Sequence, residues 1–259
     1  MDAFQTISII FSPYHVGLRD HRVGNEIQNL GVSVEFVEIE PVDDYEGEIG
    51  RRFEVMRRIS KAISNSVTKD LAFIYFDAYD DLDSPDVNEN GYLDAMGLSM
   101  LRGESWKTLM RPVPGFEPFD LSRFLYCGLQ DQSSIQRQRV IDAGMHSIWG
   151  GTERKVDFAT EPKTQLEQRS YSPALVHLDL DVLDDSYGKV NDFPSPGGLL
   201  ESDLVSCMEL VPKMTTPKSL TVCSFDLDAG DGDKIARIAI RAITIFVKSL
   251  LSEGALLKV

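Results

Sequence analysis

Short apolar segments rich in β-branched and aromatic residues recur along this chain, and segments with helical periodicity lie between them. This alternation favours a parallel sheet with helices on its faces. One helix is predicted over 51–64 and another near the C-terminus, where apolar residues from Ile235 to Phe246 recur at helical spacing after a Gly232-Asp233 cap. The predicted strands are 7–11, 33–37, 71–76, 124–127, 174–180 and 219–225.

The size and charge of the chain limit what it can be. Its 259 residues, 42% of them hydrophobic, suffice for one α/β domain, and no linker-like stretch divides them, so we predict a single domain over 1–259. Lys and Arg total 26 against 41 Asp and Glu, a net charge of −15. This charge argues against nucleic-acid and anionic-membrane partners, and it is compatible with a cationic substrate or a metal ion.

The N-terminus and the cysteines indicate a cytoplasmic protein. An acidic residue stands where a signal peptide needs basic ones, and the apolar runs are too short to span a bilayer. Cys127, Cys207 and Cys223 are scattered and odd in number, which predicts buried core thiols in a reducing compartment rather than disulfides or a Cys-x-x-Cys metal site.

Aspartates follow three of the predicted strands. Asp77 follows the apolar run LAFIYF, Asp179 and Asp181 end ALVHLDL, and Asp226 and Asp228 follow SLTVCSF. Ligands of open parallel sheets bind at the carboxyl ends of the strands. We therefore expect these acids to meet at one edge of the sheet.

The spacing of these acids predicts a metal site. Asp179 and Asp181 are two residues apart, which places both carboxylates on one strand face together with His177. Asp77 and Asp81 would also share a face if their strand continued through them. Clustered carboxylates raise one another's pKa unless a cation neutralises them, and oxygen-rich sites suit Mg²⁺, Mn²⁺ or Ca²⁺.

Several segments resemble the arginase/agmatinase (ureohydrolase) family. FDAYDDLDSP resembles its Asp-Ala-His-x-Asp signature with a later Pro, HLDLDVLDD resembles its x-Asp-x-Asp-x-x-Asp signature, and PSPGGL resembles the Pro-x-x-Gly-Gly-Leu that follows. Further segments resemble family segments in the right order: GYLDAMGLSML, YCGLQDQSSIQRQRVIDAG and PYHVGLRDHRVG. The resemblance covers most of the chain and implies a three-layer α/β fold with a central, mostly parallel sheet and helices on both faces.

The resemblance also implies a reaction. Asp77, Asp81, Asp179 and Asp181 match metal ligands of the family, whose members hold two Mn²⁺ ions. A bridging hydroxide attacks a guanidinium carbon in those enzymes and releases urea. Family members often form trimers or hexamers, so a homo-oligomer is also implied, although its contacts cannot be read from the sequence.

Two metal-binding histidines of the family are missing. No Gly-Gly-Asp-His segment precedes the first signature, and Tyr79 stands where that signature has its His. We expect His177 to act as a substitute ligand, with His15 as a weaker candidate, whereas His21 and His146 are expected to be ordinary loop or helix-end residues. The alternatives are a centre with one ion or with none.

The residues expected to act on the substrate are acidic. The proton-shuttling His of the family aligns with Asp94, which can do acid–base work if its pKa is raised or can cap the following helix. The Glu that pairs with the guanidinium aligns near Ala229. Because a carboxylate holds a guanidinium best, we expect Asp228 or Asp231 to reach in.

The positions that contact the head group of free arginine also differ. Asp83 aligns with an Asn that contacts the α-carboxylate in the family, and the charge of Asp83 would repel that carboxylate. Ser133 and Gln136 align with acids that contact the α-amino group. The pocket is therefore predicted to suit a guanidino compound that lacks this head group. The shortened chain, and the resemblance to family members that act on peptide arginine, favour an arginine side chain in a precursor peptide as substrate, converted to ornithine with release of urea. The alternatives are a small guanidino amine such as agmatine and an inactive binding or regulatory protein.

Overall fold

The protein is described here by a computed structural model, which covers residues 3–11, 26–39, 71–88, 91–113, 116–225 and 232–259. The helix predicted over 51–64 lies outside the described residues, and so do His15, His21, Asp228 and Asp231.

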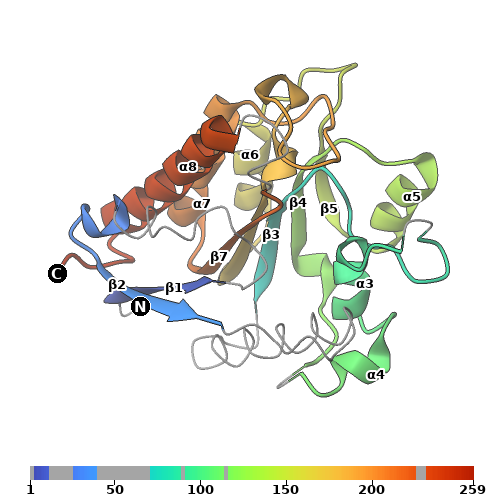
Figure 1. The fold of residues 1–259 in the computed structure, drawn as a ribbon, viewed down its shortest axis with the longest axis horizontal. Helices are drawn as coiled ribbons and strands as arrows, with labels where there is room; N and C mark the ends of the chain where they lie inside the picture. The colour runs from blue at the N-terminus through green and yellow to red at the C-terminus, as the bar shows by residue number, and fades with distance from the viewer. Residues whose placement is uncertain (1–2, 12–25, 40–70, 89–90, 114–115, 226–231) are drawn as a thin grey trace.

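Five parallel strands form the central sheet (Figure 1). Their spatial order is β5 (His146–Trp149), β4 (Phe124–Leu129), β3 (Ala72–Phe76), β6 (Ala174–Asp179) and β7 (Pro217–Cys223). A separate two-stranded parallel sheet pairs β1 (Thr6–Phe11) with β2 (Ser33–Glu38). All the predicted strands are confirmed, although two of them belong to this smaller sheet.

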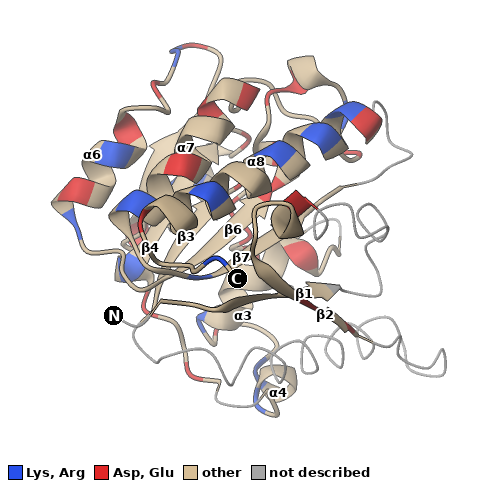
Figure 2. Cartoon of the chain, turned by 90° about the vertical axis from the view of Figure 1, so that its left-hand side faces the viewer, with Lys and Arg blue, Asp and Glu red and all other residues tan. Residues whose placement is uncertain are grey.

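Helices cover both faces of the central sheet, so the fold has the three predicted layers (Figures 1 and 2). One face carries α6 (Glu161–Gln168), α7 (Glu201–Met214) and α8 (Gly232–Ser252). The other face carries α3 (Gly97–Leu101) and α5 (Ser134–Asp142), and α4 (Lys107–Met110) follows α3 along the chain. Within the described residues, no helix combines the length and the apolar character needed to cross a membrane.

The layer of α6, α7 and α8 buries an apolar face of the sheet. Ile74 and Phe76 of β3 and Val176 and Leu178 of β6 are fully buried against it. Burying such a side chain contributes roughly 1.5–3 kcal/mol. The helix predicted near the C-terminus is α8, which begins at the predicted cap and buries the apolar residues that predicted it: Ile235, Ile238, Ala239, Ala242, Ile243 and Phe246.

The opposite face of the sheet changes from apolar to polar across its width. Tyr75 packs with aromatic side chains of β4 and with Leu98 of α3. Across β6 and β7, however, the residues in register with Tyr75 are His177 and then Thr221. Because paired residues of parallel strands point to the same face, this face presents a polar row next to the carboxyl ends of the strands.

His146 was predicted to be a loop or helix-end residue, and this prediction is wrong, because His146 is the first residue of β5. Its Nδ1 lies 2.8 Å from the hydroxyl of Tyr171. The pairing of β5 with the central strand β4 fixes this placement, because HSIW by itself is too short to show strand periodicity.

The two ends of the described chain lie side by side. Phe4, just before β1, forms a parallel bridge with Leu256, which follows α8. The N–H of Phe4 donates to the carbonyl of Ala255 at 2.8 Å, and the N–H of Val259 donates to the carbonyl of Gly31 at 2.9 Å. The smaller sheet is thus joined to the segment after α8.

Candidate metal centre

Three carboxylates meet where the neighbouring strands β3 and β6 end. Oxygens of Asp77, Asp179 and Asp181 lie within 4.8 Å of one another. The residues are 2%, 7% and 6% exposed, so this concentration of acid is almost completely removed from water. The paired strands end together, since Phe76 lies opposite Leu178 and Asp77 and Asp179 follow them.

The spacing of Asp179 and Asp181 predicted that both carboxylates lie on one strand face. This prediction is wrong for Asp181, which reaches the group from a turn after the strand. The strand ends at Asp179, whose Oδ1 accepts the N–H of Asp181 at 3.0 Å and opens the 3₁₀ turn Leu180–Val182. In the same way, β3 ends before Asp77, whose Oδ1 accepts the N–H of Tyr79 at 2.6 Å. Side-chain capping by each aspartate therefore bends the chain out of the sheet at the site.

Within the part of the chain that the structure describes, only neutral groups donate hydrogen bonds to this cluster. Asp181 accepts hydrogen bonds from the Ala78 N–H at 3.4 Å and from Asn191 Nδ2 at 3.1 Å. Among the described residues, no Lys or Arg forms an ion pair with Asp77, Asp179 or Asp181. Burial, followed by the nearby carboxylates, raises the pKa of Asp77 and of Asp181 well above the usual range. A bound cation would remove this repulsion, and all-oxygen ligands suit Mn²⁺ or Mg²⁺.

A second group of ligand atoms shares Asp179. Atoms of His177, Asp179 and Cys223 also lie within 4.8 Å of one another. The thiol of Cys223 donates to Asp179 Oδ2 at 3.3 Å, and its Sγ lies 3.4 Å from His177 Nε2. The register of β6 and β7 causes this meeting, because it places Asp179 opposite Cys223 and His177 opposite Thr221.

Comparison with known proteins identifies the fold. No protein-family model and no curated protein matches the sequence. The arginase of Bacillus caldovelox matches with a TM-score of 0.81 over 94% of this chain and 98% of that chain, at 15% identity. The arginase of Entamoeba histolytica in complex with L-ornithine gives 0.74 over 95% and 99%, at 13% identity. The proclavaminate amidino hydrolase of Streptomyces clavuligerus gives 0.57 over 95% and 73%, at 15% identity.

This chain has the arginase fold. The prediction made from the two aspartate motifs is confirmed, and identities this low establish the fold alone.

In this arginase fold, Asp81 lies beside the carboxylate cluster and is held by a tyrosine. The hydroxyl of Tyr75 donates to Asp81 Oδ2 at 2.6 Å, and the Tyr75 ring stacks on His177 with 4.1 Å between ring centroids. The backbone at Asp81 has a φ of 50°, a left-handed conformation that Asp adopts more readily than most residues. Burial raises the pKa of Asp81 to about 8, against the lowering effect of the Tyr75 hydrogen bond.

The hydroxyl of Tyr79 contacts groups outside the cluster. It lies 3.0 Å from the carbonyl of Phe193 and 3.2 Å from Asp131 Oδ2. Burial, and then Asp131, raises the pKa of Tyr79, so the side chain remains a neutral phenol at neutral pH. Tyr79 therefore offers no anionic ligand at the position where the arginase motif has a histidine.

Cys223 differs from the other two cysteines. The structure places Cys127 and Cys207 in the core as predicted, but Cys223 is only half-buried and contacts the site. Burial and then Asp179 raise the pKa of the Cys223 thiol, and burial lowers the pKa of His177 to about 4. Both groups are consequently neutral at pH 7 when no ion is bound.

Two of the other predicted residues are not in the cluster: Asp83, which lies in the first motif, and Asp94, which follows that motif. Asp94 is exposed and begins the 3₁₀ turn before α3. Asp83 accepts hydrogen bonds from Arg139 Nη1 at 3.1 Å and from Asn88 Nδ2 at 3.0 Å. The negative charge of Asp83 is thus partly neutralised by a neighbouring cation.

Ser133 and Gln136 bind each other at the start of α5. The Gln136 N–H donates to Ser133 Oγ at 3.3 Å, and the Ser133 N–H donates to Gln136 Oε1 at 3.0 Å. This reciprocal pair is a capping box, which satisfies two backbone groups at the helix N-terminus. Both side chains therefore have a structural role that is sufficient to explain their presence.

The glycine pair in PSPGGL supports the turn that carries Asp181. A Cβ added to Gly198 would lie 2.3 Å from the carbonyl oxygen of Val182 and 2.8 Å from the N of Asp184. The N–H of Gly197 donates to Asp184 Oδ2 at 2.8 Å. Glycine is required at Gly198 because the two backbone segments approach too closely for a side chain.

Tyr75, Cys223 and Asn191 are among the site residues that were missed in the sequence, as is Ser224, whose hydroxyl donates to Asp179. Tyr75 precedes Asp77 by two residues on β3, so strand alternation could have placed it on the same face. Cys223 becomes visible only when β7 is aligned with β6, because no local spacing marks it as a ligand. No sequence signal indicates that Asn191 would donate to Asp181.

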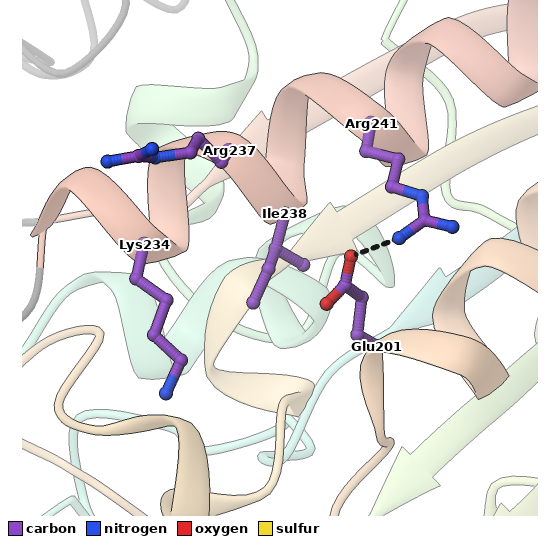
Figure 3. A pocket seen from close by; sticks show the side chains of 5 residues that line it. All are labelled: Glu201, Lys234, Arg237, Ile238 and Arg241. Carbon is purple, nitrogen blue, oxygen red and sulfur yellow. Dashed lines mark hydrogen bonds and ion pairs between the residues drawn. The ribbon is translucent and has the colours of Figure 1, made fainter.

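A surface pocket of about 490 Å³ lies elsewhere, between the beginnings of α7 and α8 (Figure 3). Its charges are already engaged, since Arg241 Nη1 lies 2.8 Å from Glu201 Oε1 and Lys234 Nζ donates to the Tyr187 carbonyl at 3.0 Å. None of the predicted site residues is in its lining, which consists of Glu201, Lys234, Arg237, Ile238 and Arg241.

Proposed function

We propose that this protein is a metal-dependent hydrolase that cleaves a guanidino group and releases urea. The observation that carries the proposal is the buried group of Asp77, Asp179 and Asp181, which has no cationic partner among the described residues. It lies at the carboxyl edge of a parallel sheet, where such folds bind their ligands. Two of the similar structures are named arginases and a third is named an amidino hydrolase, which supports the same class of reaction.

We propose that the carboxylate cluster binds Mn²⁺, because the three aspartates offer only oxygen ligands and Mn²⁺ suits such ligands. When bound there, Mn²⁺ would lower the pKa of a water ligand and supply hydroxide near neutral pH. The chain's own contribution is to fix the ligands: Asn191 and the Ala78 N–H orient Asp181, and the capping bond from Asp181 orients Asp179. Such supporting contacts commonly affect metal affinity 10- to 100-fold.

Acidic residues are proposed to handle the substrate and its proton. Asp94 is assigned to proton transfer, since its carboxylate is exposed to solvent and can exchange a proton with water. Asp228 or Asp231 is assigned to the guanidinium, which a carboxylate binds through two parallel hydrogen bonds.

The substrate we propose is an arginine side chain within a precursor peptide, converted to ornithine. Ser133 and Gln136 are neutral and bind each other, so they offer no carboxylate to a free α-amino group. Arg139 is engaged by Asp83 and by the carbonyl of Leu82, so it offers no free cation to an α-carboxylate. These contacts favour a guanidino compound that lacks the head group of free arginine.

Urea release tests the proposal. The Mn²⁺-loaded protein is incubated with an arginine-containing peptide, with agmatine and with free arginine, and we expect the peptide to react fastest. Asp181→Asn should abolish urea release, whereas Asp185→Asn, which changes an exposed acid outside the cluster, should not. Reaction with agmatine alone would indicate a small-amine enzyme. Bound metal without urea from any substrate would contradict the proposal and indicate a binding protein.

A further inference from the structure

The distances from Cys223 to His177 and to Asp179 match those between ligands of a tetrahedral metal site, and the ligand atoms of all three residues lie within 4.8 Å of one another. Cys223 Sγ lies 3.4 Å from His177 Nε2 and 3.3 Å from Asp179 Oδ2. Zinc binds sulfur at about 2.3 Å and nitrogen or oxygen at about 2.0–2.1 Å, so tetrahedral geometry places two such ligands about 3.5 Å apart. The side chains therefore need little movement to surround an ion.

The imidazole of His177 is held in an orientation suited to metal binding. Its Nδ1 lies 2.7 Å from Thr221 Oγ1, and that hydroxyl also lies 3.5 Å from the carbonyl of Val176. If the hydroxyl donates to this carbonyl, Nδ1 carries the proton and donates to the hydroxyl. The lone pair of Nε2 then faces Cys223, which is the arrangement found when a histidine binds metal and its other nitrogen is held by a neighbour.

We propose that His177, Asp179 and Cys223 bind a Zn²⁺-like transition-metal ion beside the carboxylate cluster, with Asp179 shared between the two sites. Thiolate and imidazole ligands favour zinc over manganese, so the two neighbouring sites would prefer different ions. Three protein ligands leave one coordination position for water, as in catalytic zinc sites. This inference deepens the proposed function and rests on it only through the shared Asp179.

A nucleophilic cysteine is the competing explanation for a thiol beside a histidine. Reactive cysteines lie next to cations or helix N-termini, which stabilise the thiolate. Among the described residues, the charged groups that act on Cys223 are the carboxylates of Asp179, Asp77 and Asp181, of which Asp179 is in direct contact. An ion bound between these groups would stabilise the thiolate, and no Lys or Arg among the described residues forms an ion pair with Asp179.

Cobalt binding tests the site without relying on activity. The full chain is freed of metal with a chelator and titrated with Co²⁺, which replaces Zn²⁺ and gives a near-ultraviolet sulfur–cobalt band when a thiolate binds it. We expect one equivalent of Co²⁺ to produce this band. Cys223→Ser should remove the band and weaken Co²⁺ binding about 100-fold, at least as much as the loss of a supporting contact. Cys207→Ser, which changes a buried thiol of α7, should leave the band intact.

Alkylation of Cys223 by iodoacetamide, followed by mass spectrometry, provides a second measurement that does not require a variant to fold. Zn²⁺ should slow this alkylation, because a bound thiolate is shielded. Absence of the cobalt band in the wild-type protein, or rapid alkylation that Zn²⁺ does not slow, would overturn the proposal. Rapid alkylation in both conditions would indicate the nucleophilic thiol.

The outcomes for this site and for the proposed function can be told apart. Asp181→Asn removes a ligand only of the carboxylate cluster, so it should keep the sulfur–cobalt band while losing urea release. A wild-type protein with the band but without urea release contradicts the hydrolase proposal alone. A protein that releases urea with Mn²⁺ but never shows the band contradicts the zinc-type site alone.

Discussion

Two charged regions of this protein differ in how their charges are neutralised. On the outer face of α8, basic residues are exposed (Figure 2), and two of them form ion pairs. Arg241 lies 2.8 Å from Glu201, and Arg237 lies 3.9 Å from Asp233. Water and these neighbours solvate the charges, so the concentration of basic residues on α8 indicates no ligand by itself.

At the carboxyl edge of the central sheet the situation is the opposite. Asp77, Asp179 and Asp181 are buried, contact one another, and have only neutral hydrogen-bond donors among the described residues. Unpaired charges in such surroundings are costly. The comparison teaches that burial without a partner, and not the number of charges, distinguishes a metal centre from a charged surface.

The largest expected effect concerns Asp179, the residue that both ligand groups share. A ligand that binds only the native state at 100 times its dissociation constant raises the free energy of unfolding by about 2.7 kcal/mol. We expect metal to stabilise the wild-type protein in this way and Asp179→Asn to lose the effect. Thermal unfolding with and without Mn²⁺ and Zn²⁺ measures it. If metal raised the unfolding temperature of Asp179→Asn as much as that of the wild-type protein, Asp179 would not be a metal ligand, and the two regions would not differ as described.

A smaller loss of stability is expected when the close backbone contact of Gly198 with the turn that carries Asp181 is disturbed. Gly198→Ala would force the backbone of Val182 and Asp184 apart, and such overpacking destabilises by about 1–3 kcal/mol. Metal affinity should fall with stability. Gly97→Ala is the matched control, since nothing lies within 4 Å of an added Cβ there and its φ is −53°. Chemical denaturation of both variants measures the difference, and equal stabilities would contradict the argument.

The exposed region should respond weakly. The ion pair between Arg241 and Glu201 joins side chains that are 62% and 30% exposed, and pairs of this kind contribute about 0–1 kcal/mol. Arg241→Ala is therefore expected to change the free energy of unfolding by less than about 1 kcal/mol and to leave the metal-dependent shift unchanged. If this variant lost the shift, the basic face of α8 would have to be part of the centre.

The smallest expected effect is on the pH dependence of stability, and it concerns His146, which lies outside both regions. Burial lowers the pKa of His146, so the unfolded chain binds the proton more tightly than the folded chain. The stability from neutral His146 is present above its unfolded pKa of about 6.5 and is lost as the pH falls below it. His146→Gln should therefore flatten the fall in unfolding free energy between about pH 7 and pH 5. An unchanged slope would show that other groups cause the fall.

Most of the fold could be predicted because its strands are apolar, short and locally distinct. β3 and β6 show this clearly, since β3 is an apolar run followed directly by Asp77, and β6 is apolar apart from His177 and ends in Asp179. β5 was missed because its four residues acquire strand structure through pairing with β4. That pairing is a long-range contact and leaves no periodicity in the local sequence.

The site could be predicted only as far as residue types and strand ends define it. Asp77, Asp179 and Asp181 were placed at one edge because each follows an apolar strand, but the turn at Asp179 depends on a capping hydrogen bond that spacing does not reveal. The hydrogen bond from Tyr75 to Asp81 and the position of Cys223 opposite Asp179 arise only in the folded chain. Sequence spacing carries no information about such contacts.

The bridge between Phe4 and Leu256 has a consequence for synthesis of the chain. The segment leading into β1 is synthesised before its partner, which follows only after α8 has been translated. At about 5–20 residues per second, the delay is on the order of ten to fifty seconds. Until α8 and Leu256 have been translated, Phe4 therefore lacks its final partner, and the smaller sheet cannot be joined to the segment after α8.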